Sequence, residues 1–125
     1  MKHTLLLIDD DADIRESFAD LFVYSGWTVG CAADGIEALE WLAAHERPDV
    51  ILLDLKMPRC DGYEFRERQL ADPRWKDIPT VIFTADTQVD GADLPSLRVA
   101  TVVRKSVELA QLLTVLDRAC EPSDR

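Results

Sequence analysis

Five polar side chains, three of them carboxylates, stand just after short apolar segments of the sequence. They are Asp9, Asp10, Asp54, Thr84 and Lys105. Three carboxylates that lie close together repel one another and need compensation to stay ionised, and a divalent cation supplies it. A few protein oxygens with retained water ligands suit Mg²⁺ better than Ca²⁺. The nitrogen and sulfur ligands typical of zinc are absent from the set.

This combination of residues could accept a phosphoryl group. A carboxylate on a rigid strand end, beside Mg²⁺, can attack phosphorus and hold the phosphoryl group as a mixed anhydride. The metal and a lysine neutralise the phosphoryl oxygens as charge develops, and a threonine hydroxyl can donate to one of them. Asp11 and Asp13 are interpreted differently, as the cap and the first turn of a helix.

The five residues can meet only if the apolar segments before them are neighbouring strands. We expect strands over 5–8, 27–32, 50–53, 81–84 and 101–103. Helical periodicity is expected over 12–25, 35–47, 63–71 and 107–120. Strands that alternate with helices predict a parallel α/β sheet with helices on both faces. Such sheets bind ligands beyond the carboxyl ends of their strands. Because 86–97 contains Gly91 and Pro95, any helix there is expected to be short or irregular.

Composition narrows the class of protein. The 125 residues, 47% of them hydrophobic, suit one domain, which we place at 1–121, followed by a polar tail at 122–125. A net charge of −10 argues against nucleic-acid binding, which needs a basic surface. No apolar run is long enough for a membrane span, and the N-terminus does not resemble a signal peptide. Three widely spaced cysteines offer no disulfide framework and favour a reducing cytoplasm.

Four motifs, in order along the chain from about Thr4 to Cys120, resemble those of the receiver domains of two-component response regulators. They are Leu6-Leu7-Ile8-Asp9-Asp10-Asp11, Asp54-Leu55-Lys56-Met57-Pro58-Arg59-Cys60-Asp61-Gly62, Phe83-Thr84-Ala85 and Arg104-Lys105. The resemblance implies a flavodoxin-like, doubly wound sheet of five parallel strands in the order 2-1-3-4-5, flanked by five helices.

The resemblance also assigns roles. Asp54 would be the phosphoacceptor, with Thr84 and Lys105 binding phosphoryl oxygens. The implied Mg²⁺ ligands are Asp10 directly, Asp9 mainly through water, Asp54, and the main-chain carbonyl of Lys56. Three side chains would tune the lifetime or accessibility of the phosphoryl group: Lys56, Ala85 and Asp86. We expect Lys56 and Asp86 to pair across the mouth of the site and obstruct water.

The sequence departs from the family pattern at its signalling end. Val102 stands at the switch position, where the family has an aromatic residue, and Ser106 replaces the proline after the conserved lysine. A trans peptide bond is expected before a non-proline residue. These changes lie on a surface that many relatives use for dimers and partners.

The implied function is a phosphoryl-accepting signalling switch of a two-component or phosphorelay system. A phosphohistidine on a sensor histidine kinase or histidine phosphotransfer protein would be the donor. Catalysis would be limited to the domain's own phosphorylation and dephosphorylation. With no output domain of its own, the chain would signal by associating with an unidentified protein, and a homodimer is left open.

Two alternatives stay open. A binding-only module would keep the fold and signal without phosphorylation, which the altered switch positions favour. A Mg²⁺-dependent phosphatase with an aspartyl nucleophile would resemble DxDx[TV] after the first strand. The chain has Asp9-Asp10-Asp11-Ala12-Asp13 there, without the Thr or Val, and 125 residues leave no room for a cap domain.

Two groups of residues outside the site are given structural interpretations. Cys31 and Cys120 are expected in or near the core and Cys60 as an incidental loop thiol. The alternating charges Glu64, Arg66, Glu67 and Arg68 are expected to form a solvated helix face.

Overall fold

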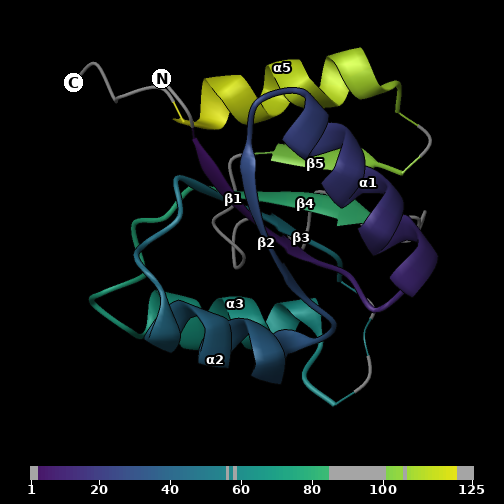
Figure 1. Ribbon diagram of the computed structural model, residues 1–125. Coiled ribbons are helices and arrows are strands. Elements are labelled where there is room, and N and C mark those ends of the chain that lie inside the picture. Colours follow the sequence, from purple (N-terminus) through teal and green to yellow (C-terminus); the bar gives the residue numbers. More distant parts are fainter. Residues whose placement is uncertain (1–2, 56, 58, 85–100, 106, 121–125) are drawn as a thin grey trace.

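The computed structural model describes residues 3–55, 57, 59–84, 101–105 and 107–120. Five parallel strands form one sheet in the order β2-β1-β3-β4-β5 (Figure 1). Their bounds are β1 Thr4–Ile8, β2 Thr28–Ala32, β3 Val50–Leu53, β4 Thr80–Thr84 and β5 Thr101–Arg104. The predicted parallel sheet and its strand order are confirmed.

Helices cover both faces of the sheet. Their bounds are α1 Ala12–Tyr24, α2 Gly35–Ala44, α3 Gly62–Leu70 and α5 Leu109–Cys120. α1 and α5 lie on one face, and α2 and α3 on the other (Figure 1). The segment predicted to hold a short or irregular fourth helix, 86–97, lies outside the described residues. In the part of the chain that is described, no helix is long and apolar enough to cross a membrane.

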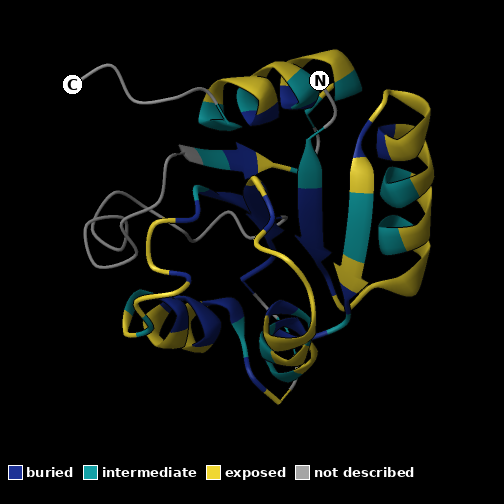
Figure 2. Cartoon of the chain, turned by 60° about the vertical axis from the view of Figure 1, so that its left-hand side comes forward, coloured by how far each residue is buried: buried dark blue, intermediate teal, exposed yellow. Residues whose placement is uncertain are grey.

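The inner strands are buried on both sides, which explains their unbroken apolar sequences. In β1, Leu5 and Leu7 pack with the core under α1 and α5, whereas Leu6 and Ile8 pack with the core under α2 and α3. All four side chains are fully buried, and the central strands form a continuous buried layer (Figure 2). The strand ends are therefore held rigidly from both faces.

Aspartates begin three of the helices. Asp11 caps α1 by accepting hydrogen bonds from the N–H groups of Asp13 and Ile14, as predicted. Asp34 caps α2 through the N–H of Glu37, and Asp61 caps α3 through the N–H of Glu64. These caps satisfy donors that a helix otherwise leaves free, and they define where each loop turns back from the strand ends.

Some burial predictions were wrong. Arg66 was predicted on a solvated face but is only 4% exposed. Its side chain turns towards the sheet, where Nη1 donates to Thr80 Oγ1 at 2.9 Å and links α3 to β4. Cys31, predicted in or near the core, is exposed on the edge strand β2. Cys60 lies in the loop before α3, as predicted, and its side chain is fully buried. Periodicity indicates which face a residue lies on, but not what covers that face.

Candidate functional site

The ends of β1 and β3 place three carboxylates together. Ile8 pairs with Leu53 in the parallel register, and the N–H of Asp54 donates to the carbonyl of Ile8 at 2.9 Å. The residues that follow the two strands therefore emerge side by side. Asp9, Asp10 and Asp54 each present a carboxylate oxygen, and these atoms lie within 4.8 Å of one another.

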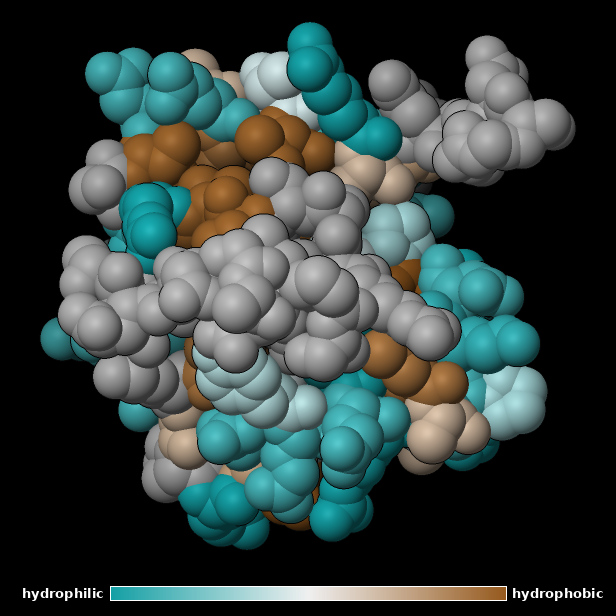
Figure 3. Space-filling model, turned by 180° about the vertical axis from the view of Figure 1, so that it is seen from behind, coloured by the Kyte–Doolittle hydropathy of each residue, from teal (hydrophilic) through white to brown (hydrophobic). Residues whose placement is uncertain are grey.

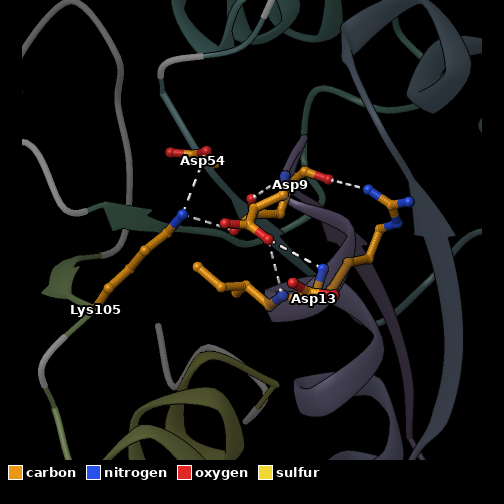
Figure 4. Close-up of polar contacts among 7 residues, drawn as sticks. Asp9, Asp13, Asp54 and Lys105 are labelled. Atoms are coloured by element: carbon orange, nitrogen blue, oxygen red, sulfur yellow. Dashed lines mark hydrogen bonds and ion pairs between the residues drawn. The ribbon is translucent and has the colours of Figure 1, made fainter.

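Asp9 is the most buried member of this cluster, at 0% exposed. Its Oδ1 accepts a hydrogen bond from the N–H of Asp11 at 2.9 Å, and its main-chain carbonyl accepts one from Arg15 Nη1 at 2.6 Å (Figure 4). Its Oδ2 is fully buried and receives no hydrogen bond of good geometry from the described residues. The fixed side chain thus presents a buried oxygen that forms an ion pair with Lys105 but accepts no hydrogen bond of good geometry within the described part of the chain.

Lys105 brings a positive charge to the cluster from the end of β5. Its Nζ lies 2.7 Å from Asp9 Oδ2 and 3.4 Å from Asp54 Oδ2 (Figure 4). Burial, the largest single influence, disfavours its charge. The hydrogen bonds and charges of Asp9 and Asp54 together outweigh burial and raise the pKa of Lys105 above its ordinary value. The ammonium is therefore held as a cation beside the carboxylates.

Thr84 ends β4 at the same edge of the sheet. Thr84 is 1% exposed, and its main-chain carbonyl accepts a hydrogen bond from the N–H of Lys105 at 3.0 Å. The register pairs Leu53 with Ile82, so Thr84 follows the residue that stands opposite Asp54. The backbone thus brings the predicted hydroxyl and ammonium residues to the edge that carries the carboxylates.

The donor set fits Mg²⁺. Three carboxylates and one ammonium sum to a formal charge of −2, and a divalent cation neutralises it. The buried Asp9 Oδ2, which ion-pairs without a good hydrogen bond, is the kind of oxygen that a metal or its water ligand can satisfy. The residues would hold the ion through oxygen alone, which suits a hard cation.

Several predicted site residues lie outside the described part of the chain. They are Lys56, Ala85 and Asp86, together with Ser106 among the departures from the family pattern. Val102, the predicted switch position, is half-buried on β5. Viewed from behind, apolar side chains gather below α5 (Figure 3), and Val102, Val107 and Val115 contribute to the lining of an open pocket there.

The start of α3 packs very closely against the end of β3. The N–H of Gly62 donates to the carbonyl of Leu55 at 2.9 Å. A Cβ at Gly62 would lie 2.4 Å from the carbonyl oxygen of Asp54 and 2.7 Å from Leu55 Cα. Since both contacts are backbone atoms, only glycine fits here without moving the strand end.

Two arginines that support the site and the loop beside it were not predicted from the sequence. Arg15 supports Asp9 through its carbonyl, and Arg59 Nε donates to Asp34 Oδ2 at 2.7 Å. The position of Arg15 on the first turns of the predicted helix was a usable signal, because one turn of helix brings a long side chain back to the strand end. Asp34 and Arg59 are 25 positions apart, and nothing in their local sequence indicates the contact.

A carboxylate cluster with an ammonium, at the carboxyl edge of a five-stranded doubly wound sheet, is the arrangement expected of a phosphoacceptor regulatory domain. Comparison with known proteins identifies the family within that class. Residues 5–117 match the family model of the response regulator receiver domain, and the chain belongs to that family.

Relatives and solved structures agree with this assignment. The chain is 43% identical over 89 residues to the response regulator MprA of Mycobacterium ulcerans, an overlap that covers 71% of this chain and 37% of that protein. For MprA of Mycobacterium leprae the identity is 42% over 85 residues, covering 68% and 36%. The chain therefore spans little more than a third of the length of the curated relatives it matches.

The fold matches solved receiver structures over nearly its whole length. The chemotaxis protein CheY4 of Vibrio cholerae is 27% identical, with a TM-score of 0.86 over 95% of this chain and 99% of that one. A response regulator receiver protein from Pseudomonas putida is 25% identical, also with a TM-score of 0.86, over 94% and 98%. The chain is thus a receiver domain, a regulatory phosphoacceptor of two-component systems.

Proposed function

We propose that this domain accepts a phosphoryl group on Asp54 with the help of Mg²⁺. The observation that carries the proposal is the convergence of Asp9, Asp10 and Asp54 within 4.8 Å at one sheet edge, with Lys105 paired to two of them. Asp54 is the candidate nucleophile because it follows the central strand β3 and is 5% exposed. Asp9 and Asp10 come from one turn and are suited to hold the cation together.

The transfer step can be written with this chain's own groups. An oxygen of the Asp54 carboxylate attacks phosphorus, a P–O bond forms, and the bond from phosphorus to the donor's leaving group breaks. With a phosphohistidine donor the P–N bond breaks, and the imidazole leaves with the electron pair and takes up a proton. Lys105, 3.4 Å from Asp54 Oδ2, offsets negative charge on the transferred group, and Thr84 can donate its hydroxyl to another phosphoryl oxygen.

The metal would be held by Asp9, Asp10, Asp54 and the main-chain carbonyl of Lys56. When bound, Mg²⁺ neutralises phosphoryl oxygens and relieves the repulsion among the carboxylates. Asp9 is oriented for this by its hydrogen bond from the N–H of Asp11. Lys56, Ala85 and Asp86 would set access to the acceptor and the lifetime of the acyl phosphate.

Receiver domains interact with histidine kinases or histidine phosphotransfer proteins, and we propose a phosphohistidine of such a protein as the donor. The domain would occupy residues 1–121, followed by a polar tail at 122–125. Signalling by association with a separate protein, without an output domain, is part of the proposal, as is a cytoplasmic location. The domain would catalyse only its own phosphorylation and dephosphorylation.

Intact-protein mass spectrometry after incubation with acetyl phosphate tests the proposal. One phosphoryl adduct that forms with Mg²⁺, and neither in EDTA nor in Asp54→Asn, is expected. Asp61→Asn is the matched control, because this aspartate lies in the same loop but caps α3. An adduct of equal yield in Asp54→Asn would refute the assignment.

A binding-only module is the second candidate function. The observation that favours it is Val102, a half-buried aliphatic residue at the position where a switch would need an aromatic ring. A module of this kind would show no adduct with acetyl phosphate or with a phosphorylated phosphotransfer protein.

A further inference from the structure

The loop between β3 and α3 is anchored at its apex to the first turn of α2. Arg59 Nε donates to Asp34 Oδ2 at 2.7 Å, and the N–H of Gly35 donates to the carbonyl of Cys60 at 2.9 Å. Asp34 also caps α2 through Oδ1, which accepts from the N–H of Glu37. One carboxylate therefore starts the helix and holds the loop at the same time.

The partners differ in exposure. The side chain of Asp34 is 7% exposed, whereas that of Arg59 is 58% exposed. The hydrogen bond from Arg59, the largest influence, holds the pKa of Asp34 below its ordinary value against the opposing effect of burial. Removing the guanidinium would leave a buried carboxylate with less compensation, which makes this pair stronger than an ordinary surface ion pair.

The backbone at Arg59 is also unusual. Its φ of 62° lies in the left-handed region, which residues with a Cβ seldom adopt unless their surroundings enforce it. The Arg59 side chain donates to Asp34 at 2.7 Å, and this contact is suited to hold the unusual backbone conformation in place.

The C-terminal end of the loop, at Gly62, is in close contact with the main chain of Asp54 and Leu55. Gly62 closes the loop on Leu55 and leaves no space beside the carbonyl of Asp54. Cys60, between the apex and this closure, is fully buried, and a Cβ on Gly35 would lie 2.4 Å from its Sγ. Displacement of the apex from α2 would therefore shift the main chain that carries Asp54.

We propose that the Asp34–Arg59 ion pair is a latch: it holds Arg59 and Cys60 against α2, so that Asp54 stays beside Asp9 and Asp10. Latch closure and Mg²⁺ binding then favour each other. Asp34 and Arg59 are positioning residues, since neither belongs to the carboxylate cluster. The inference rests on the proposed function of Asp54. Because coupling between two sites is reciprocal, bound Mg²⁺ should also keep the latch closed.

Cys60 reports on the latch without any measurement of activity. It is buried between the loop and α2, Cys31 is exposed, and Cys120 is half-buried. Labelling with N-ethylmaleimide, followed by peptide mass spectrometry, gives a separate rate for each thiol. We expect Mg²⁺ to slow the labelling of wild-type Cys60 by about three- to tenfold, with Cys31 unchanged.

Two substitutions open the latch. Asp34→Asn keeps an oxygen for the N–H of Glu37 and removes the charge, and Arg59→Gln removes the guanidinium of an exposed side chain. Arg74→Gln is the matched control, because it breaks a 2.8 Å pair with Asp72 outside the acceptor loop. Arg59→Gly separates the ion pair from backbone strain, since glycine adopts the left-handed conformation freely.

The latch variants, including Arg59→Gly, should label Cys60 faster and bind Mg²⁺ about three- to tenfold more weakly in an NMR titration. Arg74→Gln should match wild type in both. Faster Cys60 labelling with wild-type Mg²⁺ affinity would overturn the coupling, as would Mg²⁺ that binds wild type without protecting Cys60. Wild type that neither binds Mg²⁺ nor takes a phosphoryl group from acetyl phosphate would instead refute the proposed function.

Discussion

Neutralising the acceptor should stabilise the fold in the absence of metal. Asp54 presents an oxygen within 4.8 Å of oxygens on Asp9 and Asp10, and its Oδ2 lies 3.4 Å from Lys105 Nζ. With an effective dielectric constant of about 20, each like-charged pair costs at least roughly 3.5 kcal/mol, and the pair with Lys105 contributes about 5 kcal/mol. The two repulsions together thus exceed the attraction by about 2 kcal/mol. Because Asp10 is exposed and solvent screens its charge, the net repulsion falls to about 1 kcal/mol.

Thermal unfolding followed by circular dichroism measures this difference. In EDTA, the Tm of Asp54→Asn should exceed that of wild type by roughly 3 to 8 °C, the shift that about 1 to 2 kcal/mol produces in a domain of this size. Mg²⁺ at ten times its dissociation constant adds about 1.4 kcal/mol to wild type and should narrow the gap, because the variant has lost one ligand.

Asp72→Asn is the matched control for this prediction. Asp72 is paired with Arg74 at 2.8 Å, and the hydrogen bonds from Arg74 hold its pKa below the ordinary value. Its removal should leave the Tm unchanged or lower it. If Asp54→Asn also lowered the Tm in EDTA, attraction to Lys105 would dominate the site, and the argument that the carboxylates need a cation would be wrong.

Three further predictions concern the loop, the latch and the core. Gly62→Ala should abolish phosphorylation by acetyl phosphate, because its Cβ would lie 2.4 Å from the Asp54 carbonyl; Gly26→Ala, at a φ of 101° with open space around it, should lower stability by about 1 kcal/mol and leave phosphorylation intact. In urea unfolding at a series of pH values, wild type should be more stable than Asp34→Asn near neutral pH. The folded-state pKa of Asp34 is depressed, so that advantage should disappear as the pH falls below 3.8 towards the folded-state value, and an advantage that persisted in strong acid would contradict the ion-pair account. Leu112→Ala, at a fully buried position on the inner face of α5, should cost about 2 to 5 kcal/mol in the same urea assay, and a loss below about 1 kcal/mol would contradict this packing.

Much of the fold follows from local patterns in the sequence. The unbroken apolar runs Leu5–Ile8 and Val50–Leu53 predict strands buried on both faces, and the structure confirms this because helices cover both sides. Asp11 and Asp34 precede apolar periodicity and were correctly predicted as helix caps. The convergence of Asp9, Asp10 and Asp54 followed from the rule that parallel strands end at one edge of the sheet.

The rest depends on contacts between distant segments. Nothing local to Arg66 shows that Thr80 will accept its hydrogen bond, so its charge suggested a solvated face. Cys60 looked like an ordinary loop residue because its burial depends on Gly35, which approaches from α2. The burial of charged and small residues is therefore hard to predict from sequence, because it depends on segments that are distant in the chain.

The position of the phosphoryl group is the most direct test of the central claim. Borohydride reduces an aspartyl phosphate to homoserine and leaves free carboxylates unchanged, so peptide mass spectrometry after reduction identifies the acceptor residue. Protein treated with acetyl phosphate and Mg²⁺ should contain homoserine at position 54 alone, with Asp9 and Asp10 intact. Homoserine at another aspartate, or a stable adduct that borohydride does not convert, would contradict the assignment of Asp54.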